Sequence, residues 1–173
     1  MSYKPKFKRH RLGITDYRKR KRLLKSRKIR AVIRKSLKYI RVQFVKYDEK
    51  GDIVLASAIS SDLERFGWKK APKDTTPAAY LTGLLAGKRA KGKGITECIV
   101  DIGRYTPTRG SRLFAAVKGI IDAGIKCPCD ESVFPSEDRI KGEHLKIKPD
   151  VSVDEVREKI LGGSLDGGSR SST

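Results

Sequence analysis

The first quarter of the chain carries so much positive charge that it cannot form a protein core by itself. Nineteen Lys or Arg residues and one acid, Asp16, lie between Met1 and Tyr47, which gives this segment a net charge of +18. The whole chain of 173 residues has a net charge of +20, so the rest is nearly neutral. Because like charges at this density repel one another, the sequence predicts a basic N-terminal part that needs an anionic partner.

The most basic stretch, "TDYRKRKRLLKSRKIR" at residues 15–30, predicts a helix. Thr15 is the expected N-cap, Asp16 suits the first turn, and the helix should end near Lys28. Cations occupy most sides of this helix, and burying an unpaired ammonium group is prohibitively expensive. Residues 1–14 hold a proline, a glycine and no helical period, so they should be extended and disordered until bound. The partner of the helix must therefore be hydrated and negative.

Nucleic acid and an anionic membrane surface are the two polyanions that could neutralise this segment. A helix lying on a membrane needs a broad apolar face, and this one offers only Tyr17, Leu23, Leu24 and Ile29. No apolar run reaches the ~20 residues of a membrane span, and the N-terminus does not resemble a signal peptide. RNA is favoured over DNA because basic segments that order on binding suit folded RNA, and the sequence shows no helix-turn-helix pattern, zinc finger or leucine zipper. A solvated face without a partner is the simpler alternative.

A β-hairpin is predicted after the basic helix. Alternate residues of 37–47 are apolar, which indicates a strand with one buried face, and "IVLASAI" at 53–59 follows a turn as its partner. The other face of the first strand carries an aromatic ring, a cation and an amide, namely Tyr39, Arg41 and Gln43. These groups could stack on and hydrogen-bond unpaired bases, or form an ordinary polar face.

The remaining elements predict an α/β fold. Thr76 as N-cap and Pro77 open a helix in which Gly83 and Gly87 permit close packing, a short strand follows in "ECIVDIG", and a helix spans 111–124. Ser152 and Glu155 form the capping box of a last helix. Strands that alternate with helices predict a single layered domain with a mixed β-sheet and packed helices, preceded by the basic extension and helix.

Three segments are expected along the chain. Residues 1–34 form the basic RNA-binding extension and helix, residues 35–161 the globular α/β domain, and residues 162–173 a flexible tail rich in glycine and serine.

The loop "GRYTPTRGSR" at residues 103–112 is a second candidate site. It precedes a helix whose first N–H groups favour an anion, Ser111 can cap that helix, and Arg104, Arg109 and Arg112 stand around it. The spacing is not that of a Walker loop, so an RNA phosphate is favoured over a nucleotide substrate. Alternatively, the glycines and the proline of this loop merely turn the chain.

Metal and catalytic sites are not expected. Cys98, Cys127 and Cys129 are too few and too unevenly spaced for a disulfide framework, and the two histidines are far apart in sequence. We interpret the protein as reduced and cytosolic, without a cofactor. Asp101 and Glu97 share a strand face, yet such a pair is more often a surface feature than a catalytic acid and base.

Four motifs in this order resemble one known family: "TDYRKRKRLL", "AAYLTGLLAGKRA", "DIGRYTPTRGSRLFAAVKGIIDAGI" and "FPSEDRIKGEHL". The chain is similar, over roughly Phe7 to Leu145, to the large-ribosomal-subunit protein eighteen family in its archaeal and eukaryotic form. The resemblance implies a non-enzymatic ribosomal protein that binds 5S rRNA and helps attach it to the large-subunit rRNA in the central protuberance. Neighbouring ribosomal proteins are further implied partners, and a membrane or small-molecule substrate is not. The alternative is a non-ribosomal nucleic-acid-binding protein, such as one that packages DNA.

The candidate RNA contacts come from the basic segment, the exposed strand face and the loop. They are Lys4, Lys6, Lys8, Arg9, Arg11, Tyr17, Arg18, Arg20, Lys21, Arg22, Lys25, Arg27, Lys28, Arg30, Tyr39, Arg41, Gln43, Arg104, Thr106, Thr108, Arg109 and Arg112.

Overall fold

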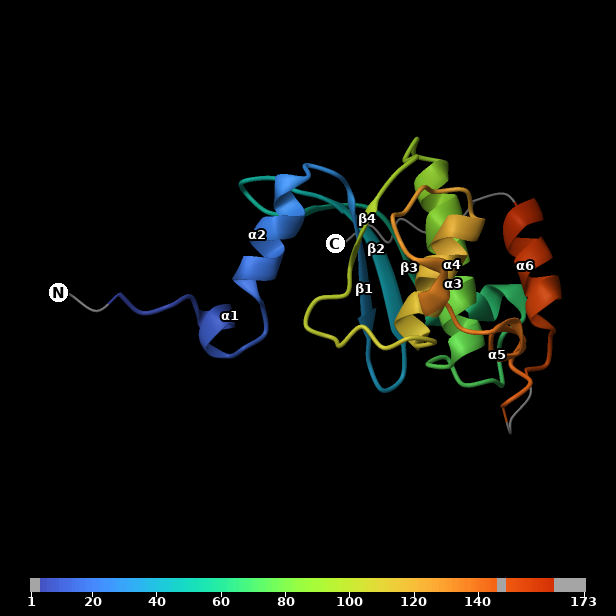
Figure 1. Cartoon of the computed structure of the whole chain (residues 1–173). Coiled ribbons are helices and arrows are strands. Elements are labelled where there is room, and N and C mark those ends of the chain that lie inside the picture. Colours follow the sequence, from blue (N-terminus) through green and yellow to red (C-terminus); the bar gives the residue numbers. More distant parts are fainter. Residues whose placement is uncertain (1–3, 146–148, 164–173) are drawn as a thin grey trace, which may run out of the picture.

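The helices of the basic N-terminal segment lie on one side of a four-stranded sheet, and the later helices lie on the other (Figure 1). The computed structural model describes residues 4–145 and 149–163. The strands are β1 (Arg30–Lys35), β2 (Ile40–Lys46), β3 (Ile53–Ile59) and β4 (Ile99–Asp101), in the order β3-β2-β1-β4. β1 pairs antiparallel with β2 and parallel with β4, and β2 pairs antiparallel with β3. The predicted mixed sheet, α/β class and hairpin are therefore confirmed.

The helices that follow β3 pack on one face of the sheet and form the core with it. α3 (Thr76–Lys91) covers β2 and β3, and α4 (Arg112–Asp122) lies beside α3 and reaches β1. The apolar side chains that alternate along β2 are fully buried against them, because the strand period of two points Ile40, Val42 and Phe44 to the same side. The other elements are α1 (Lys8–Arg11), α2 (Tyr17–Lys25), η1 (Ser60–Phe66), η2 (Glu131–Val133), α5 (Glu137–Lys141) and α6 (Val153–Gly162).

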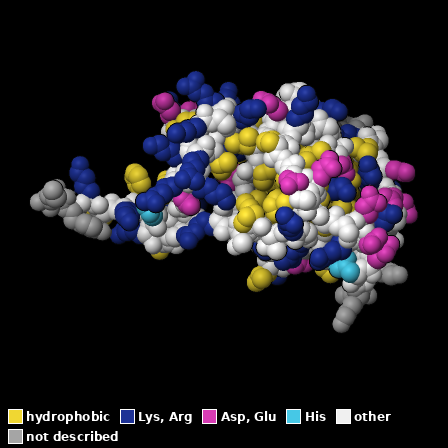
Figure 2. Space-filling view, in the orientation of Figure 1, with side chains coloured by type: hydrophobic (Ala, Val, Ile, Leu, Met, Phe, Trp, Pro, Cys, Tyr) yellow, Lys and Arg dark blue, Asp and Glu magenta, His cyan; other side chains and the backbone are white. Residues whose placement is uncertain are grey.

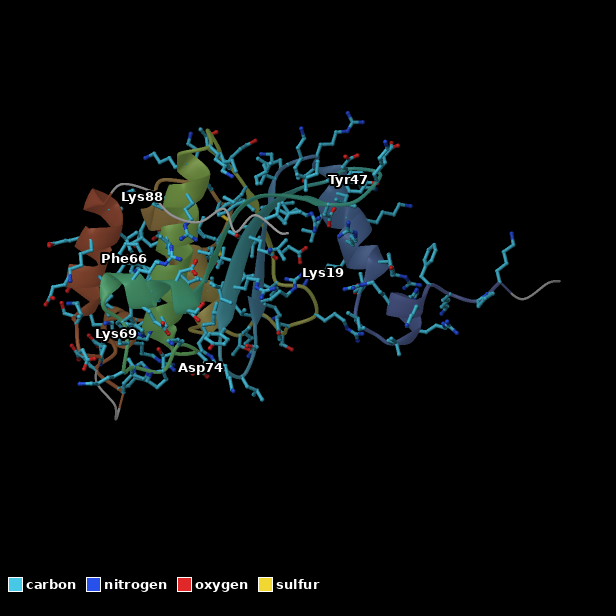
Figure 3. The ribbon with its side chains drawn as sticks, turned by 180° about the vertical axis from the view of Figure 1, so that it is seen from behind. Lys19, Tyr47, Phe66, Lys69, Asp74 and Lys88 are labelled. Atoms are coloured by element: carbon cyan, nitrogen blue, oxygen red, sulfur yellow. The ribbon has the colours of Figure 1, made fainter. Side chains whose placement is uncertain are left out.

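Glycines bring α3 and α4 into backbone contact. A Cβ atom at Gly83 would lie 2.1 Å from the carbonyl oxygen of Ala116, and one at Gly119 would lie 2.1 Å from that of Tyr80. No side chain fits at such distances, so the close approach predicted for α3 is confirmed. On the far side of α3, Lys88 Nζ donates to carbonyl oxygens at the end of α6, including that of Ile160 at 2.6 Å (Figure 3).

The helix caps differ from the expected ones in two places. Asp16, not Thr15, caps α2, because its carboxylate accepts from the N–H groups of Arg18 and Lys19 at 3.0 and 3.1 Å. α3 begins after Thr75 rather than Thr76. The capping residue of α6 is confirmed, since the Ser152 hydroxyl accepts from Glu155 N at 3.2 Å.

The N-terminal third of the chain departs most from the expected structure. The helix ends at Lys25 rather than near Lys28, and the segment expected to be extended holds a helical turn, α1. β1 was not predicted, and the expected boundary at residue 34 falls inside this strand, which lies between β2 and β4. Most of the expected C-terminal tail, residues 164–173, lies outside the described residues.

Candidate nucleic-acid interface

α2 has an inner face toward the sheet and an outer face toward solvent. Lys19, Arg20 and Leu23 are half-buried on the inner side. The exposed cations follow helical spacing on the outer side, and they are Arg18, Lys21, Arg22 and Lys25. Figure 2 shows Lys and Arg side chains gathered over this end of the molecule, whereas acids are mixed with them over the globular part. We call these four residues the outer row.

The segment before α2 adds further exposed cations. Its lysines and arginines are all exposed, and they are Lys4, Lys6, Lys8, Arg9 and Arg11. Tyr17 is half-buried because its ring lies 5.9 Å from that of Phe7 and 5.8 Å from that of His10. These ring contacts fold α1 back toward the start of α2.

Polar contacts, rather than buried apolar groups, dock α2 on the protein. α2 contains no buried residue. Lys19 Nζ donates to the carbonyl oxygen of Gly103 at 2.8 Å, and Arg20 donates to both carboxylate oxygens of Asp52 at 2.9 Å. The guanidinium of Arg104 donates to the carbonyl oxygen of Gly13, just before the helix.

The sheet face under α2 is lined by polar side chains. Register places Arg34 beside Arg41, and Val32 beside Gln43. Arg41 is exposed and Gln43 is half-buried. Tyr39 lies in the turn before β2 and is 38% exposed. The predicted strand face is therefore present and not covered by the packed helices.

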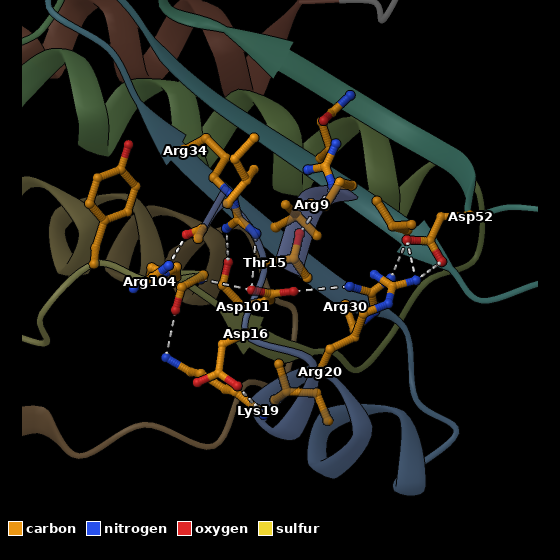
Figure 4. A pocket seen from close by; sticks show the side chains of 18 of the residues that line it. Arg9, Thr15, Asp16, Lys19, Arg20, Arg30, Arg34, Asp52, Asp101 and Arg104 are labelled. Carbon is orange, nitrogen blue, oxygen red and sulfur yellow. Dashed lines mark hydrogen bonds and ion pairs between the residues drawn. The ribbon is translucent and has the colours of Figure 1, made fainter. Parts of the chain in front are cut away.

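A cavity of about 810 Å³ lies between α2 and this face of the sheet (Figure 4). It has an apolar floor formed in part by Val32, Val45 and Val54. Its charged walls include Arg9, Asp16, Lys19, Arg20, Arg30, Arg34, Asp52, Asp101 and Arg104. Cations outnumber acids around it, which favours an anionic occupant.

Arg30 is an exception among the candidate RNA contacts. Its side chain is 2% exposed and pairs with Asp52 at 2.7 Å and Asp101 at 2.9 Å. Arg34 pairs with the second oxygen of Asp101 at 3.1 Å. Because both acids lie inside the protein's own network, Arg30 holds the sheet together and does not face a partner. We therefore remove it from the interface.

The two acids of this network stay ionised. Burial works to raise the pKa of Asp52, but hydrogen bonds from Arg30 and Arg20 outweigh it and hold that pKa below its ordinary value. Burial likewise opposes ionisation of Asp101, and the charge of Arg34 with the Gly103 N–H group lowers the pKa of that carboxyl overall. Cations and anions therefore alternate through this network, from Arg20 of α2 through Asp52 and Arg30 to Asp101 at the end of β4.

The cations between α2 and β1 remain at the surface. Arg27 is exposed and adopts a left-handed backbone, with φ of 53°. Lys28 is exposed and pairs with Glu97 at 2.8 Å. Glu97 and Asp101, weighed above as an acid and base, thus each bind a cation of the protein.

The loop at 103–112 does not gather its arginines at one point. Arg104 reaches toward the segment before α2, Arg109 lies near Asp130, and Arg112 pairs with Asp74 at 2.7 Å. Figure 3 shows Asp74 well apart from Lys19 of α2. The three arginines that the sequence places around this loop therefore do not converge on one point.

The N–H groups of this loop are largely used inside the protein. Those of Thr108, Gly110 and Ser111 donate to carbonyl oxygens of Thr106, Val133 and Thr108. Ser111 occupies the cap position of α4, but its hydroxyl makes no capping hydrogen bond. The exposed side chains that remain for a partner are Arg104, Thr106, Thr108 and Arg109.

Other kinds of site have little support in the described part of the chain. No group of three or more His, Cys, Asp or Glu side chains is placed there to hold a metal ion. Cys98 is buried, and Cys127 and Cys129 are half-buried free thiols. No helix among the described residues is long and apolar enough to cross a membrane.

Sequence reasoning missed the residues that position this surface. Lys19, Arg34, Asp52 and Asp101 were not among the candidate RNA contacts, although all four line the cavity and Lys19 and Asp52 dock α2. For Asp52 and Asp101 the sequence held one weak signal, namely that acids are few beside so many cations. Both acids pair with Arg30, which lies 22 residues from Asp52 and 71 residues from Asp101 in sequence. No local sequence pattern could therefore indicate the pairing.

Comparison with known proteins gives consistent matches. The model of the family "Ribosomal large subunit proteins 60S L5, and 50S L18" matches residues 1–96. The large ribosomal subunit protein uL18 of Korarchaeum cryptofilum is 55% identical over 143 residues, which cover 83% of this chain and 73% of that protein. The uL18 protein of Methanococcoides burtonii is 46% identical over 165 residues, or 92% of this chain and 94% of its own. That of Saccharolobus solfataricus is 49% identical over 145 residues, covering 83% and 72%.

Proposed function

Since this chain belongs to the family of the ribosomal large subunit proteins 60S L5 and 50S L18, we propose that it binds 5S rRNA and helps attach it to the large-subunit rRNA in the central protuberance. Family membership makes it a structural protein of the large ribosomal subunit. The finer assignment, to 5S rRNA, is what the resemblance of the four sequence motifs implies, and the surface described above supports an RNA partner.

The observation that carries the proposal is the outer row of α2. Its four cations repeat at intervals of three and four residues, so they form one continuous positive face along the helix. None of them is buried, and α2 stands on the open side of the sheet (Figure 1). Such a face suits the phosphate backbone of a folded RNA, which supplies much of the binding free energy in such complexes.

The open sheet face supplies contacts of a second kind. Tyr39, Arg41 and Gln43 offer a ring, a guanidinium and an amide, and Gln43 lines the cavity beside the basic helix. Aromatic and guanidinium planes stack on unpaired bases, and an amide reads their edges. Phosphate contacts from α2 and base contacts from β2 together would favour RNA with unpaired nucleotides over a DNA duplex.

A catalytic role has no comparable support. The two carboxylates on and beside β4 bind cations of the protein itself, Asp101 with Arg30 and Glu97 with Lys28. A general base needs an accessible carboxylate within reach of a substrate. The function proposed is therefore assembly: large-subunit rRNA and neighbouring ribosomal proteins are the further partners.

An electrophoretic shift assay with purified 5S rRNA tests the proposal. The protein is titrated into labelled 5S rRNA at one fixed salt concentration, and a DNA duplex of similar length is the competitor. We expect a discrete complex that excess duplex does not displace. Equal affinity for the duplex would instead support the alternative, a non-ribosomal nucleic-acid-binding protein that packages DNA.

A further inference from the structure

Asp52 joins two cations that belong to different layers of the molecule. It lies directly before β3, on the turn that follows β2, and accepts from Arg20 of α2 and from Arg30 of β1 (Figure 4). Arg20 Nη2 lies 2.9 Å from both carboxylate oxygens of Asp52, so one charged nitrogen is shared between them. Asp52 thus ties the basic helix to the centre of the sheet.

The anchoring of Asp52 is firmer than that of a surface ion pair. Arg30 is 2% exposed and is itself fixed by Asp101, whose side chain is 9% exposed. Asp52 and Arg20 are 28% and 31% exposed, so water screens their contact only in part. A fixed inner arginine therefore orients the carboxylate toward α2.

α2 has few other means of holding its place. It buries no residue, and nine residues are too few for a stable isolated helix in water. A second tie is the Lys19 ammonium on the Gly103 carbonyl oxygen, and Arg104 binds the Gly13 carbonyl oxygen just before the helix. The helix should therefore loosen, and fray, when the Arg20 contact is lost.

We propose that Asp52 is a positioning residue for RNA: it holds α2 against the sheet so that the outer row is displayed as one rigid positive face before the RNA arrives. The idea rests on the proposed function and deepens it. A carboxylate in this position helps the protein bind a polyanion, since an ordered helix loses less conformational entropy on binding than a loose one.

Charge alone makes the opposite prediction. Removing any acid raises the net positive charge, which should strengthen RNA binding. The sign of the effect therefore separates positioning from simple electrostatics. Asp48 lies in the same turn and is exposed, so Asp48→Asn changes the net charge equally and serves as the matched control.

Three full-length variants are compared for 5S rRNA affinity at fixed salt. Asp52→Asn should weaken binding by about fivefold or more, whereas Asp48→Asn should leave it unchanged or strengthen it. Arg20→Lys keeps the charge and leaves the Arg30 pair in place, but the lysine side chain ends one bond short of the position of Arg20 Nη2, so it should weaken binding as well. The proposal is overturned if the Asp52→Asn variant binds 5S rRNA as tightly as the Asp48→Asn variant does.

Amide hydrogen exchange of the free proteins supplies a readout that does not depend on RNA. In Asp52→Asn and Arg20→Lys, amides within α2 should exchange faster than in the original protein, while those of β2 keep their protection. Unchanged exchange in α2 contradicts a role for Asp52 in holding the helix. If the original protein does not prefer 5S rRNA, the proposed function fails, and the exchange comparison still decides whether Asp52 positions α2.

Discussion

Arg30 carries its charge inside the protein, between the carboxylates of Asp52 and Asp101. Removing one partner of a buried ion pair leaves the other charge desolvated, which costs about 3–5 kcal/mol. Asp101→Ala should therefore lower the free energy of unfolding by about 3 kcal/mol, because Asp52 remains as a partner. Glu97→Ala, four residues earlier, breaks the exposed pair with Lys28 and should cost about 1 kcal/mol or less. Denaturant unfolding of both variants measures the difference, and equal costs would contradict the structural role assigned to Arg30.

The same two aspartates make stability depend on acid. Their pKa values in the folded protein lie below the ordinary 3.8, so their contribution is fully present above that value and is lost as the pH falls through the folded pKa. The free energy of unfolding should therefore decrease below about pH 4. The decrease should be smaller in Asp101→Asn, which has one such group fewer. A decrease of the same size in both proteins would place the acid sensitivity elsewhere.

Among the elements, β2 combines a buried face with a polar one, and we propose that RNA contacts the polar face together with Tyr39, which precedes the strand. If an unpaired base stacks on Tyr39, Tyr39→Ala should weaken 5S rRNA binding by about 1–3 kcal/mol, roughly five- to 150-fold. The ring is 38% exposed, so the melting temperature should change little. RNA titration and thermal melting of the variant check both points. Unchanged affinity in a folded protein would make this an ordinary polar strand face.

Elements with a clear period were predictable from the sequence, and β1 was not. β2 alternates apolar and polar residues, and α4 repeats apolar residues at helical spacing, so both were expected. β1 reads "RAVIRK": three apolar residues run together between cations that continue the basic stretch. Its first arginine, Arg30, is neutralised by Asp52 and Asp101, which are distant in sequence. Charge alone therefore suggested an exposed extension. Long-range pairing is the information that a local pattern does not contain.

The candidate site was predictable in kind but not in arrangement. Charge density indicated a polyanion partner, and most of the candidate cations are exposed in the structure. Which side of α2 faces outward depends on Asp52 and Gly103, both distant in sequence from the helix. The loop at 103–112 shows the same limit, since its arginines point to three separate partners that its own sequence does not reveal.

At the scale of the whole molecule, the positive charge is concentrated in a part that the core does not need. Neither α1 nor α2, which precede β1, contains a buried residue. A chain that begins at Arg27 therefore keeps every strand and all helices of the core. A chain that begins near Lys35 would instead lose β1 from between β2 and β4. The shorter chain from Arg27 lacks eleven Lys or Arg residues. It should fold and yet bind RNA far more weakly.

The salt dependence of 5S rRNA binding by these two chains tests the central claim most directly. If about eight cations of the basic segment meet phosphates, the logarithm of the affinity of the full chain should fall against the logarithm of salt concentration with a slope near −6 to −7. The chain that begins at Arg27 should give a slope that is flatter by several units, and a cooperative thermal unfolding transition should show that it folds without α1 and α2. Equal slopes for the two chains would remove the N-terminal segment from the RNA interface and contradict the account.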